Sequence, residues 1–216
     1  MFDLTLTFDN GPDPQVTPRV LDILRARGLK ATFFVVGRKL DHPDGSALVR
    51  AALADGHRIG NHTLTHTVPL GENPAPDAAE AEIAATDRLL RAIGVETRLF
   101  RPFGGGGNLD TRLLKPSVVD HLVAEGYSCV LWNAIPRDWA DPEGWVETAL
   151  EQCAAQPWTL IVLHDLPTGA MDRLETFLDR AAALGARFRQ DFPEACVPIR
   201  AGRIAAPLTD YVSALP

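Results

Sequence analysis

Short apolar runs alternate with longer stretches of helical periodicity along the 216-residue chain. Between the apolar runs, hydrophobic side chains recur at a spacing of three and four residues, typical of helices that bury one face. Most of these helical stretches end near a glycine or proline. The runs predict strands at 2–8, 31–36, 98–100, 127–132, 160–163 and 187–188, and helices at 14–27, 46–54, 77–93, 111–125, 143–155 and 171–184.

Repeated β-α steps of this kind predict an α/β fold with a parallel sheet. The number of steps in so short a chain favours a distorted or incomplete (β/α) barrel of about seven strands over an open nucleotide-binding sheet. We expect residues 1–216 to form a single domain. Active sites of such barrels lie on the loops that follow the strands. Five polar residues stand at or just beyond expected strand ends, and one face could gather them: Asp9, His62, Arg101, Asp138 and His164.

Composition and charge indicate which kinds of binding partner are unsuited to this protein. Apolar residues make up 46% of the chain and charged residues 23%, as in ordinary globular proteins. The net charge of −7 and the absence of a basic stripe argue against nucleic-acid binding. No apolar run approaches the length of a membrane span, and no signal peptide is evident. Three widely spaced cysteines favour free thiols, and we therefore expect a cytoplasmic protein. The oligomeric state stays open.

Two histidines carry the strongest chemical signal. His62 and His66 are four residues apart, a spacing that would place both imidazoles on one face of a helical turn. First-row metals use such pairs when a third ligand comes from elsewhere in the fold. Asp9 and Asn10 directly follow the first expected strand and precede a Gly11-Pro12 turn, which would hold them rigidly. Either could supply the third ligand.

Five short motifs resemble those of the polysaccharide deacetylases of the NodB-homology type, carbohydrate esterase family 4. The family's Thr-Phe-Asp-Asp-Gly-Pro resembles Thr7-Phe8-Asp9-Asn10-Gly11-Pro12, and its His-Ser/Thr-x-x-His matches His62-Thr63-Leu64-Thr65-His66 in full. Its Arg-x-Pro-Tyr is similar to Arg101-Pro102-Phe103-Gly104. Its Asp-Trp matches Asp138-Trp139, and its Leu-x-His is approximated by Val162-Leu163-His164-Asp165. The motifs occur in the family's order and span nearly the whole chain.

The resemblance implies a hydrolase that removes the acetyl group of an N-acetylated or O-acetylated sugar with a divalent metal, commonly zinc. By matching positions, His62 and His66 would bind the metal, Asp9 would act as general base and His164 as general acid. Arg101 would orient Asp9, and Asp138 would raise the pKa of His164. The expected substrate is a small or oligomeric acetylated carbohydrate, and the positions expected to bind it are Phe103, Gly104, Trp139 and Leu163.

Some positions depart from the family pattern. Asn10 stands where the family has a metal-binding aspartate, and a neutral amide is a weaker donor than a carboxylate. Zinc affinity should therefore be reduced, unless Asp13 substitutes as a ligand. Ile135 replaces the first aspartate of the fourth motif, and Phe103 replaces a tyrosine. The glycine run 104–107 could supply oxyanion or substrate contacts, or be a loop without catalytic use.

Three functions are consistent with these residues. The first is the metal-dependent deacetylase. The second, motivated by Asn10, is a metal-independent hydrolase of C–N bonds in a small cyclic amide or imide on the same fold. The third is a non-catalytic carbohydrate-binding homologue. Retention of Asp9, Arg101, Asp138 and His164 argues against the third, because a binding module needs neither an acid nor a base.

Overall fold

A computed structural model describes residues 1–214. Over this range, nine strands form one sheet in the order β6-β1-β2-β3-β4-β5-β8-β9, and β7 pairs with β1 outside this path. Pairing is parallel among β1 to β7 and antiparallel at β8 and β9. The strands are β1 (Phe2–Asp9), β2 (Thr32–Val35), β3 (Arg58–Asn61), β4 (Leu99–Phe100), β5 (Ser128–Cys129), β6 (Trp158–His164), β7 (Ala186–Arg189), β8 (Ile199–Arg200) and β9 (Arg203–Ile204).

The long strand β1 organises the sheet. It pairs with β6 along most of its length, with β7 near its beginning and with β2 near its end. On the far side, the chain after β5 returns toward β6, and Ala134 pairs with Ile161 in a single bridge. The sheet therefore curls into a distorted (β/α) barrel whose closure between β5 and β6 is minimal. This arrangement confirms the predicted fold class.

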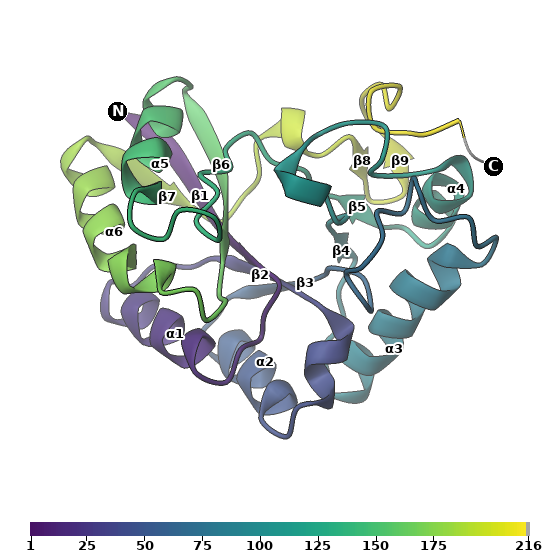
Figure 1. The fold of residues 1–216 in the computed structure, drawn as a ribbon, viewed down its shortest axis with the longest axis horizontal. Coiled ribbons are helices and arrows are strands. Elements are labelled where there is room, and N and C mark those ends of the chain that lie inside the picture. Colours follow the sequence, from purple (N-terminus) through teal and green to yellow (C-terminus); the bar gives the residue numbers. More distant parts are fainter. Residues whose placement is uncertain (215–216) are drawn as a thin grey trace.

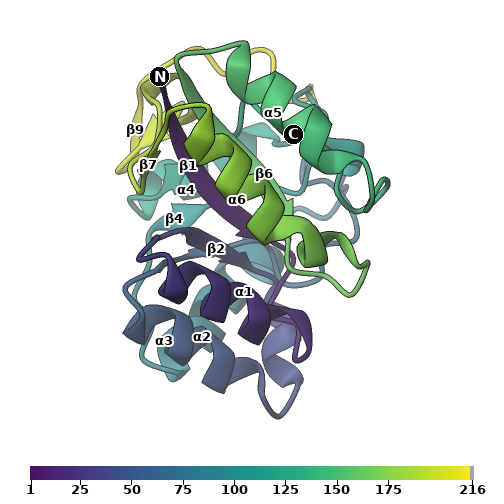
Figure 2. The same ribbon diagram turned by 90° about the vertical axis from the view of Figure 1, so that its left-hand side faces the viewer.

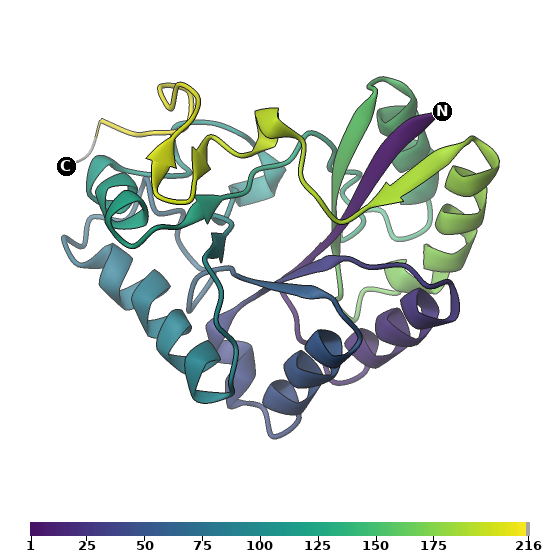
Figure 3. The ribbon, with the colours of Figure 1, turned by 180° about the vertical axis from the view of Figure 1, so that it is seen from behind.

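The helices lie outside the curled sheet. Figure 1 shows them as an outer arc, with α5 and α6 on one side, α1 and α2 below, and α3 and α4 on the other side. Seen from the left of that view, α1, α5 and α6 cover β1 and β6 (Figure 2). The view from behind shows the N-terminus beside α5 and the last described residues near α4 (Figure 3). The helices are α1 (Val16–Ala26), α2 (Gly45–Ala54), α3 (Ala85–Ala92), α4 (Pro116–Ala124), α5 (Trp145–Ala154) and α6 (Leu174–Ala183).

Alternation along β1 separates the core from the interior of the barrel. Leu4, Leu6 and Phe8 belong to the hydrophobic cluster that joins the sheet to α1, α2, α5 and α6. Successive side chains of a strand point to opposite faces, so Thr5, Thr7 and Asp9 face the barrel interior. All three are buried. The face of β1 toward the barrel interior is therefore polar and ends in the carboxylate of Asp9.

Several predicted boundaries were wrong. The sequence prediction missed β3, because Arg58-Ile59-Gly60-Asn61 has a single large apolar side chain, and it missed the β8–β9 hairpin. The expected helix 111–125 begins only at Pro116. The expected helix 77–93 is helical over 78–92 but contains a π-helical turn, Glu80–Ala84. Tertiary pairing, which local pattern does not report, decides the missed strands. The start of α4 has a local cause, because Pro116 suits the first turn of a helix and not its interior.

The structure also bears on two expectations from composition, that the cysteines are free thiols and that the chain has no membrane span. Cys129, Cys153 and Cys196 are all free and buried. Burial raises the pKa of the Cys129 thiol to about 12 and that of the Cys153 and Cys196 thiols to about 11. Within residues 1–214, none of the helices combines the length and the apolar character needed to cross a membrane.

Candidate active site

The register of β1 and β6 places two site residues side by side. Asp9 is the last residue of β1 and lies opposite His164, the last residue of β6. Both face the barrel interior at the carboxyl end of the sheet, and both are buried. An acidic and a basic group thus meet because two parallel strands end at the same level, which is how barrels assemble sites from distant segments.

A fully buried arginine supports Asp9. Arg101 follows β4, and its Nη1 donates to Asp9 Oδ1 at 2.8 Å and to Thr7 Oγ1 at 2.7 Å. The remaining donors reach main-chain carbonyls of residues 130 and 131, and the guanidinium lies over the Phe34 ring, 4.1 Å from its centroid. Burial lowers the pKa of Arg101, and the Asp9 charge opposes this shift. All three guanidinium nitrogens are thus engaged and hold Asp9 Oδ1 in place, while Asp9 Oδ2 lies 3.6 Å from His62 Nε2.

A second carboxylate supports His164. Asp138, which has no exposed surface, accepts hydrogen bonds from His164 Nδ1 at 2.7 Å and from the His164 main-chain N–H at 2.9 Å. Burial by itself lowers the pKa of His164, but the hydrogen bond and charge of Asp138 outweigh it, and the pKa is raised overall. With Nδ1 engaged, Nε2 is the nitrogen available to a substrate. The Trp139 ring packs edge-on against the imidazole, with 4.7 Å between the ring centroids.

The two metal-ligand candidates lie on a loop and not on a helical turn. His62 to His66 follow β3 in irregular structure, so the predicted helical turn was wrong here. Thr63 and His66 have φ of 67° and 54°, a left-handed conformation that costs non-glycine residues about 1–3 kcal/mol each. The loop nevertheless brings the two imidazoles to a centroid separation of 4.7 Å. Two left-handed residues therefore pair the rings as a helical turn would have done.

Hydrogen bonding fixes the orientation of His62. Its Nδ1 donates to the Arg101 carbonyl oxygen at 2.8 Å, which leaves Nε2 free, 3.6 Å from Asp9 Oδ2. Burial lowers the pKa of His62 to about 3, and burial together with the neighbouring His62 lowers that of His66 to about 3. Both rings are therefore neutral near pH 7, as metal ligation requires. A main-chain carbonyl behind a ligating imidazole is a common orienting partner.

Asn10 has an unpaired acceptor and lies beside the two histidines. It adopts φ of 74°, lines the cleft with both histidines, and its Oδ1 is buried without a hydrogen-bond partner. Asp13 is not placed as a substitute ligand: it does not line the cleft, and its Oδ1 accepts from the Gln15 and Val16 main-chain N–H groups at the start of α1. Among residues 1–214, no group of three or more His, Cys, Asp and Glu side chains could hold a metal.

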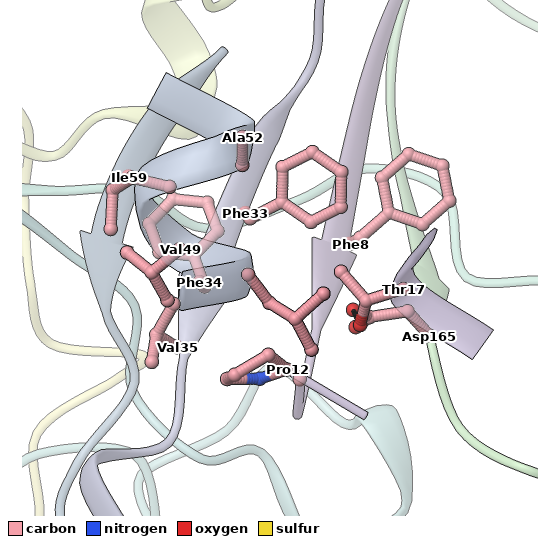
Figure 4. Close-up of a pocket in the computed structure, with 12 residues that line it drawn as sticks. Phe8, Pro12, Thr17, Phe33, Phe34, Val35, Val49, Ala52, Ile59 and Asp165 are labelled. Carbon is pink, nitrogen blue, oxygen red and sulfur yellow. Dashed lines mark hydrogen bonds between the residues drawn. The ribbon is translucent and has the colours of Figure 1, made fainter. Parts of the chain in front are cut away.

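The turn after β1 is packed against a second buried carboxyl. A side chain at Gly11 would collide with the carboxyl of Asp165, which also accepts a hydrogen bond from the Thr17 hydroxyl. Figure 4 shows Thr17 and Asp165 together beside Pro12, at one end of a small internal pocket. Burial raises the pKa of Asp165 to about 7. Only glycine therefore fits between Asn10 and Pro12.

The carboxyl end of the sheet contains a cleft of about 230 Å³. Asp9, Asn10, His62, His66 and His164 line it on the polar side. Of the predicted substrate positions, Phe103, Gly104 and Trp139 line it as well. The expectation for Leu163 was wrong: it is fully buried in the core against the helices, because strand alternation turns Val162 and His164 inward instead.

The glycine run forms part of the cleft wall. A Cβ at Gly104 would lie 2.7 Å from the Trp132 ring, and one at Gly107 would lie 2.6 Å from Ile135 Cδ1. The Trp132 indole N–H donates to the Gly107 carbonyl oxygen at 3.2 Å. Close packing therefore explains Gly104 and Gly107, and a left-handed φ of 70° explains Gly106.

Comparison with known proteins agrees with this geometry. The sequence model of the family described as polysaccharide deacetylase matches residues 3–117, slightly more than half of the chain. The chain belongs to the polysaccharide deacetylase family. A peptidoglycan-N-acetylglucosamine deacetylase of Bacillus cereus is 35% identical over 177 residues, 80% of this chain and 76% of the relative. A chitooligosaccharide deacetylase of Rhizobium leguminosarum bv. trifolii is 36% identical over 168 residues, 76% of this chain and 71% of the relative.

Solved structures of deacetylases and esterases show the same fold. A peptidoglycan N-acetylglucosamine deacetylase, solved with an N-oxidanyl-benzamide compound, has a TM-score of 0.71 at 28% identity and covers 87% of this chain and 85% of its own. A family 4 acetyl xylan esterase from Clostridium thermocellum, solved with a cobalt ion, has a TM-score of 0.68 at 27% identity and covers 86% of both chains.

Sequence reasoning missed several residues of this deacetylase site. Thr7 ties Arg101 to the main chain of β6 by donating to the Ile161 carbonyl oxygen. Leu166 and Trp132 line the cleft. Glu82, eighteen residues beyond Leu64, contacts the loop that carries the histidines. Alternation in β1 could have indicated Thr7, but no local pattern points to Glu82.

Proposed function

We propose that this protein is a metal-dependent deacetylase of an acetylated sugar or oligosaccharide, with Asp9 as base and His164 as acid. One observation carries the proposal. A single cleft at the carboxyl end of the sheet is lined by Asp9, His164, the two neutral imidazoles of His62 and His66, and Asn10, whose amide oxygen is buried and unpaired. That combination suits metal-assisted hydrolysis of an acyl group and has no purpose in a protein that only binds sugar.

The donor set fits a divalent metal. His62 and His66 would contribute imidazole nitrogens, and Asn10 would contribute its unpaired Oδ1. The weaker amide donor predicts lower affinity than an all-charged set would give. A metal held there would supply a Lewis acid for the acetyl carbonyl. Zinc is our first candidate because two nitrogens and one oxygen suit it.

The proton transfers follow from the two supported groups. Asp9 would remove a proton from the water that attacks the acetyl carbonyl carbon. Arg101 keeps the Asp9 carboxylate oriented by donating to Oδ1. His164 would give its proton to the departing nitrogen or oxygen as the bond to the carbonyl carbon breaks, which releases acetate and the free amine or hydroxyl. The raised pKa of His164, caused by the hydrogen bond and charge of Asp138, favours the protonated form that this task needs.

The substrate we propose is a short N-acetylglucosamine oligomer, and an O-acetylated sugar is the second choice. The relatives named above act, by their names, on chitooligosaccharide and peptidoglycan N-acetylglucosamine. A cleft of about 230 Å³ can enclose an acetyl group and part of one sugar, so the remaining sugars would lie outside it. Because all nine strands share one sheet, we also infer that residues 1–216 form one NodB-homology domain.

Acetate release from tetra-N-acetylchitotetraose tests the proposal. Protein stripped with chelator would be assayed alone, with added Zn²⁺ and with added Co²⁺. Restoration of activity by either metal is the expected result. Absence of acetate release in all three samples, with acetylated xylan oligomers also unreactive, would refute it.

One observation favours a second function. The third donor is a neutral amide, and the described residues hold no group of three His, Cys, Asp and Glu that could bind a metal. A metal-independent hydrolase of a small cyclic amide or imide would need only the acid and the base. Turnover of hydantoin or a succinimide that persists in chelator would favour this function over the deacetylase.

A further inference from the structure

The loop that carries the two histidines needs support from outside itself. Thr63 and His66 both lie in the left-handed region, and Thr63 is β-branched, for which this conformation is a true outlier. Inside the loop, the bond from the His66 main-chain N–H to Thr63 Oγ1 opposes relaxation. A segment with this backbone would open if nothing else held it, and the imidazoles would separate.

One carboxylate accepts from the main-chain N–H groups in the middle of the loop, while the Thr63 and Leu64 carbonyl oxygens accept from the Gly37 and Arg38 main-chain N–H groups, both at 2.9 Å. Glu82 Oε2 accepts hydrogen bonds from the main-chain N–H groups of Leu64 and Thr65, both at 2.9 Å. Its other oxygen, Oε1, accepts from the Thr65 hydroxyl at 2.7 Å. Three donors from two consecutive residues therefore converge on one side chain. Hydrogen bonds to a charged acceptor are stronger than neutral ones, which suits a clamp on a strained segment.

The π-helical turn Glu80–Ala84 brings this carboxylate into place. The next residue of the same turn, Ile83, uses its main-chain oxygen to accept from Asn61 Nδ2 at 2.8 Å. Asn61 in turn accepts from the Thr63 main-chain N–H through Oδ1 at 3.0 Å. Two adjacent residues of one π-turn thus hold both the start and the middle of the loop. Single π-turns in helices commonly occur at functional sites.

We propose that Glu82 is a positioning residue that sets the separation of His62 and His66 for metal binding. The proposal rests on the proposed metal-dependent function, because it treats these two imidazoles as ligands. Glu82 does not line the cleft. Its effect therefore passes through the main chain of residues 64 and 65.

Three variants test the clamp. Glu82→Ala removes both acceptor oxygens and with them all three hydrogen bonds, and it should weaken Zn²⁺ binding about 10- to 100-fold, the usual effect of losing a partner that orients a ligand. Glu82→Gln should stay close to the parent protein, since its amide oxygen can still accept from both N–H groups and its NH₂ can donate to the Thr65 hydroxyl. Glu80→Ala is the matched control, because Glu80 belongs to the same turn but pairs with Arg88 at the surface.

Two readouts separate this proposal from the function it rests on. Zn²⁺ affinity would be measured by competition with a chromophoric chelator. Amide hydrogen exchange at Leu64 and Thr65 would be measured in metal-free protein, where Glu82→Ala should accelerate exchange about tenfold or more relative to Glu80→Ala. If the parent protein binds no zinc while Glu82→Ala still loosens these amides, the metal proposal fails and the clamp stands.

Unchanged zinc affinity together with unchanged exchange in a folded Glu82→Ala variant would overturn the inference. Should that variant not fold, Thr65→Val provides a milder test, because it deletes only the hydroxyl that Oε1 accepts from. We expect it to weaken zinc binding about threefold at an unchanged melting temperature. Affinity equal to that of the parent protein would count against the clamp.

Discussion

The site has two halves that are built in different ways. The strand half, Asp9 with Arg101 and His164 with Asp138, stands at or near strand ends, and its charged groups are paired at 2.7–2.8 Å. The loop half, Asn10 with His62 and His66, stands on left-handed or irregular backbone and keeps one buried oxygen unpaired. The difference teaches that topology alone can place an acid and a base, whereas ligand positions need dedicated local contacts such as Glu82 and Asn61.

The largest expected effect comes from removing the base of the strand half. Asp9→Asn should lower kcat/KM for acetate release by about 10²- to 10⁴-fold, the usual contribution of a general base. His164→Ala should act similarly on the acid side. Circular dichroism would verify that both variants fold, and Asp120→Asn, on an exposed face of α4, is the control. Rates within tenfold of the parent protein for both variants would contradict the assigned roles.

Stability should depend strongly on the buried cation of the same half. Arg101→Leu leaves Asp9 buried without its partner and should lower the free energy of unfolding by about 3–5 kcal/mol. Arg112→Leu is the matched control, because Arg112 pairs with Asp110 near the surface and its loss should cost less than about 1 kcal/mol. Urea denaturation measures both. Equal costs for the two variants would show that the strand half does not depend on this pairing.

A smaller effect is expected in the loop half. Asn10→Asp replaces a neutral oxygen donor with a charged one and should tighten Zn²⁺ binding by about tenfold or more, which corresponds to roughly 1.4 kcal/mol. Isothermal titration would measure the change. An unchanged zinc affinity would mean that the amide of Asn10 does not contact the metal.

The smallest expected effect concerns stability at different pH values. The free energy of unfolding should depend on pH with opposite sign for a histidine of the loop half and a histidine of the strand half. His66 has its pKa lowered from 6.5 to about 3 in the folded protein, so stability is lost as pH falls through this range. His164 has its pKa raised above 6.5, so its contribution is full below 6.5 and is lost as pH rises through the folded pKa. The two histidines therefore act in different pH windows.

Variants of metal-free protein would test these signs. On acidification from pH 6.5 to about pH 5.5, His66→Gln should lose about 1 kcal/mol less stability than the parent protein. On acidification from alkaline pH to 6.5, His164→Gln should fail to gain the stability that the parent protein gains. The free energy of unfolding, measured in urea at each pH, decides both. If the free energy of unfolding changed with pH in the same way in the parent protein and both variants, the proposed difference between the two halves would be wrong.

The strand half was the more predictable from sequence. Strand ends in a parallel barrel meet at one face, so Asp9, Arg101 and His164 could be grouped from the order of strands and helices along the chain. The assignment of Leu163 to the cleft failed because Leu163 is the middle residue of the Leu-x-His motif. The outer positions of that motif, Val162 and His164, are the ones that strand alternation points inward. Motif spacing and strand period therefore agree on which residues line the cleft.

The loop half resisted prediction for physical reasons. A spacing of four residues is compatible with a helical turn and also with a loop containing two left-handed residues, and propensities favour the former over Thr63 at φ of 67°. Glu82 stabilises the loop through a π-turn, which local pattern does not encode. The unpaired oxygen of Asn10 depends on the packing around it, and no sequence motif contains that information.

Three cysteines allow unfolding to be followed by chemical labelling, because all of them are free and buried in the folded protein: Cys129, Cys153 and Cys196. A thiol-reactive dye needs an exposed thiolate, and burial both hides these sulfurs and raises their pKa to about 11 or 12. The dye should therefore label the protein only when the barrel opens, and the folded protein should remain unlabelled. Because no cysteine lies among the proposed ligands, the same labelling could be followed with and without zinc on unmodified protein.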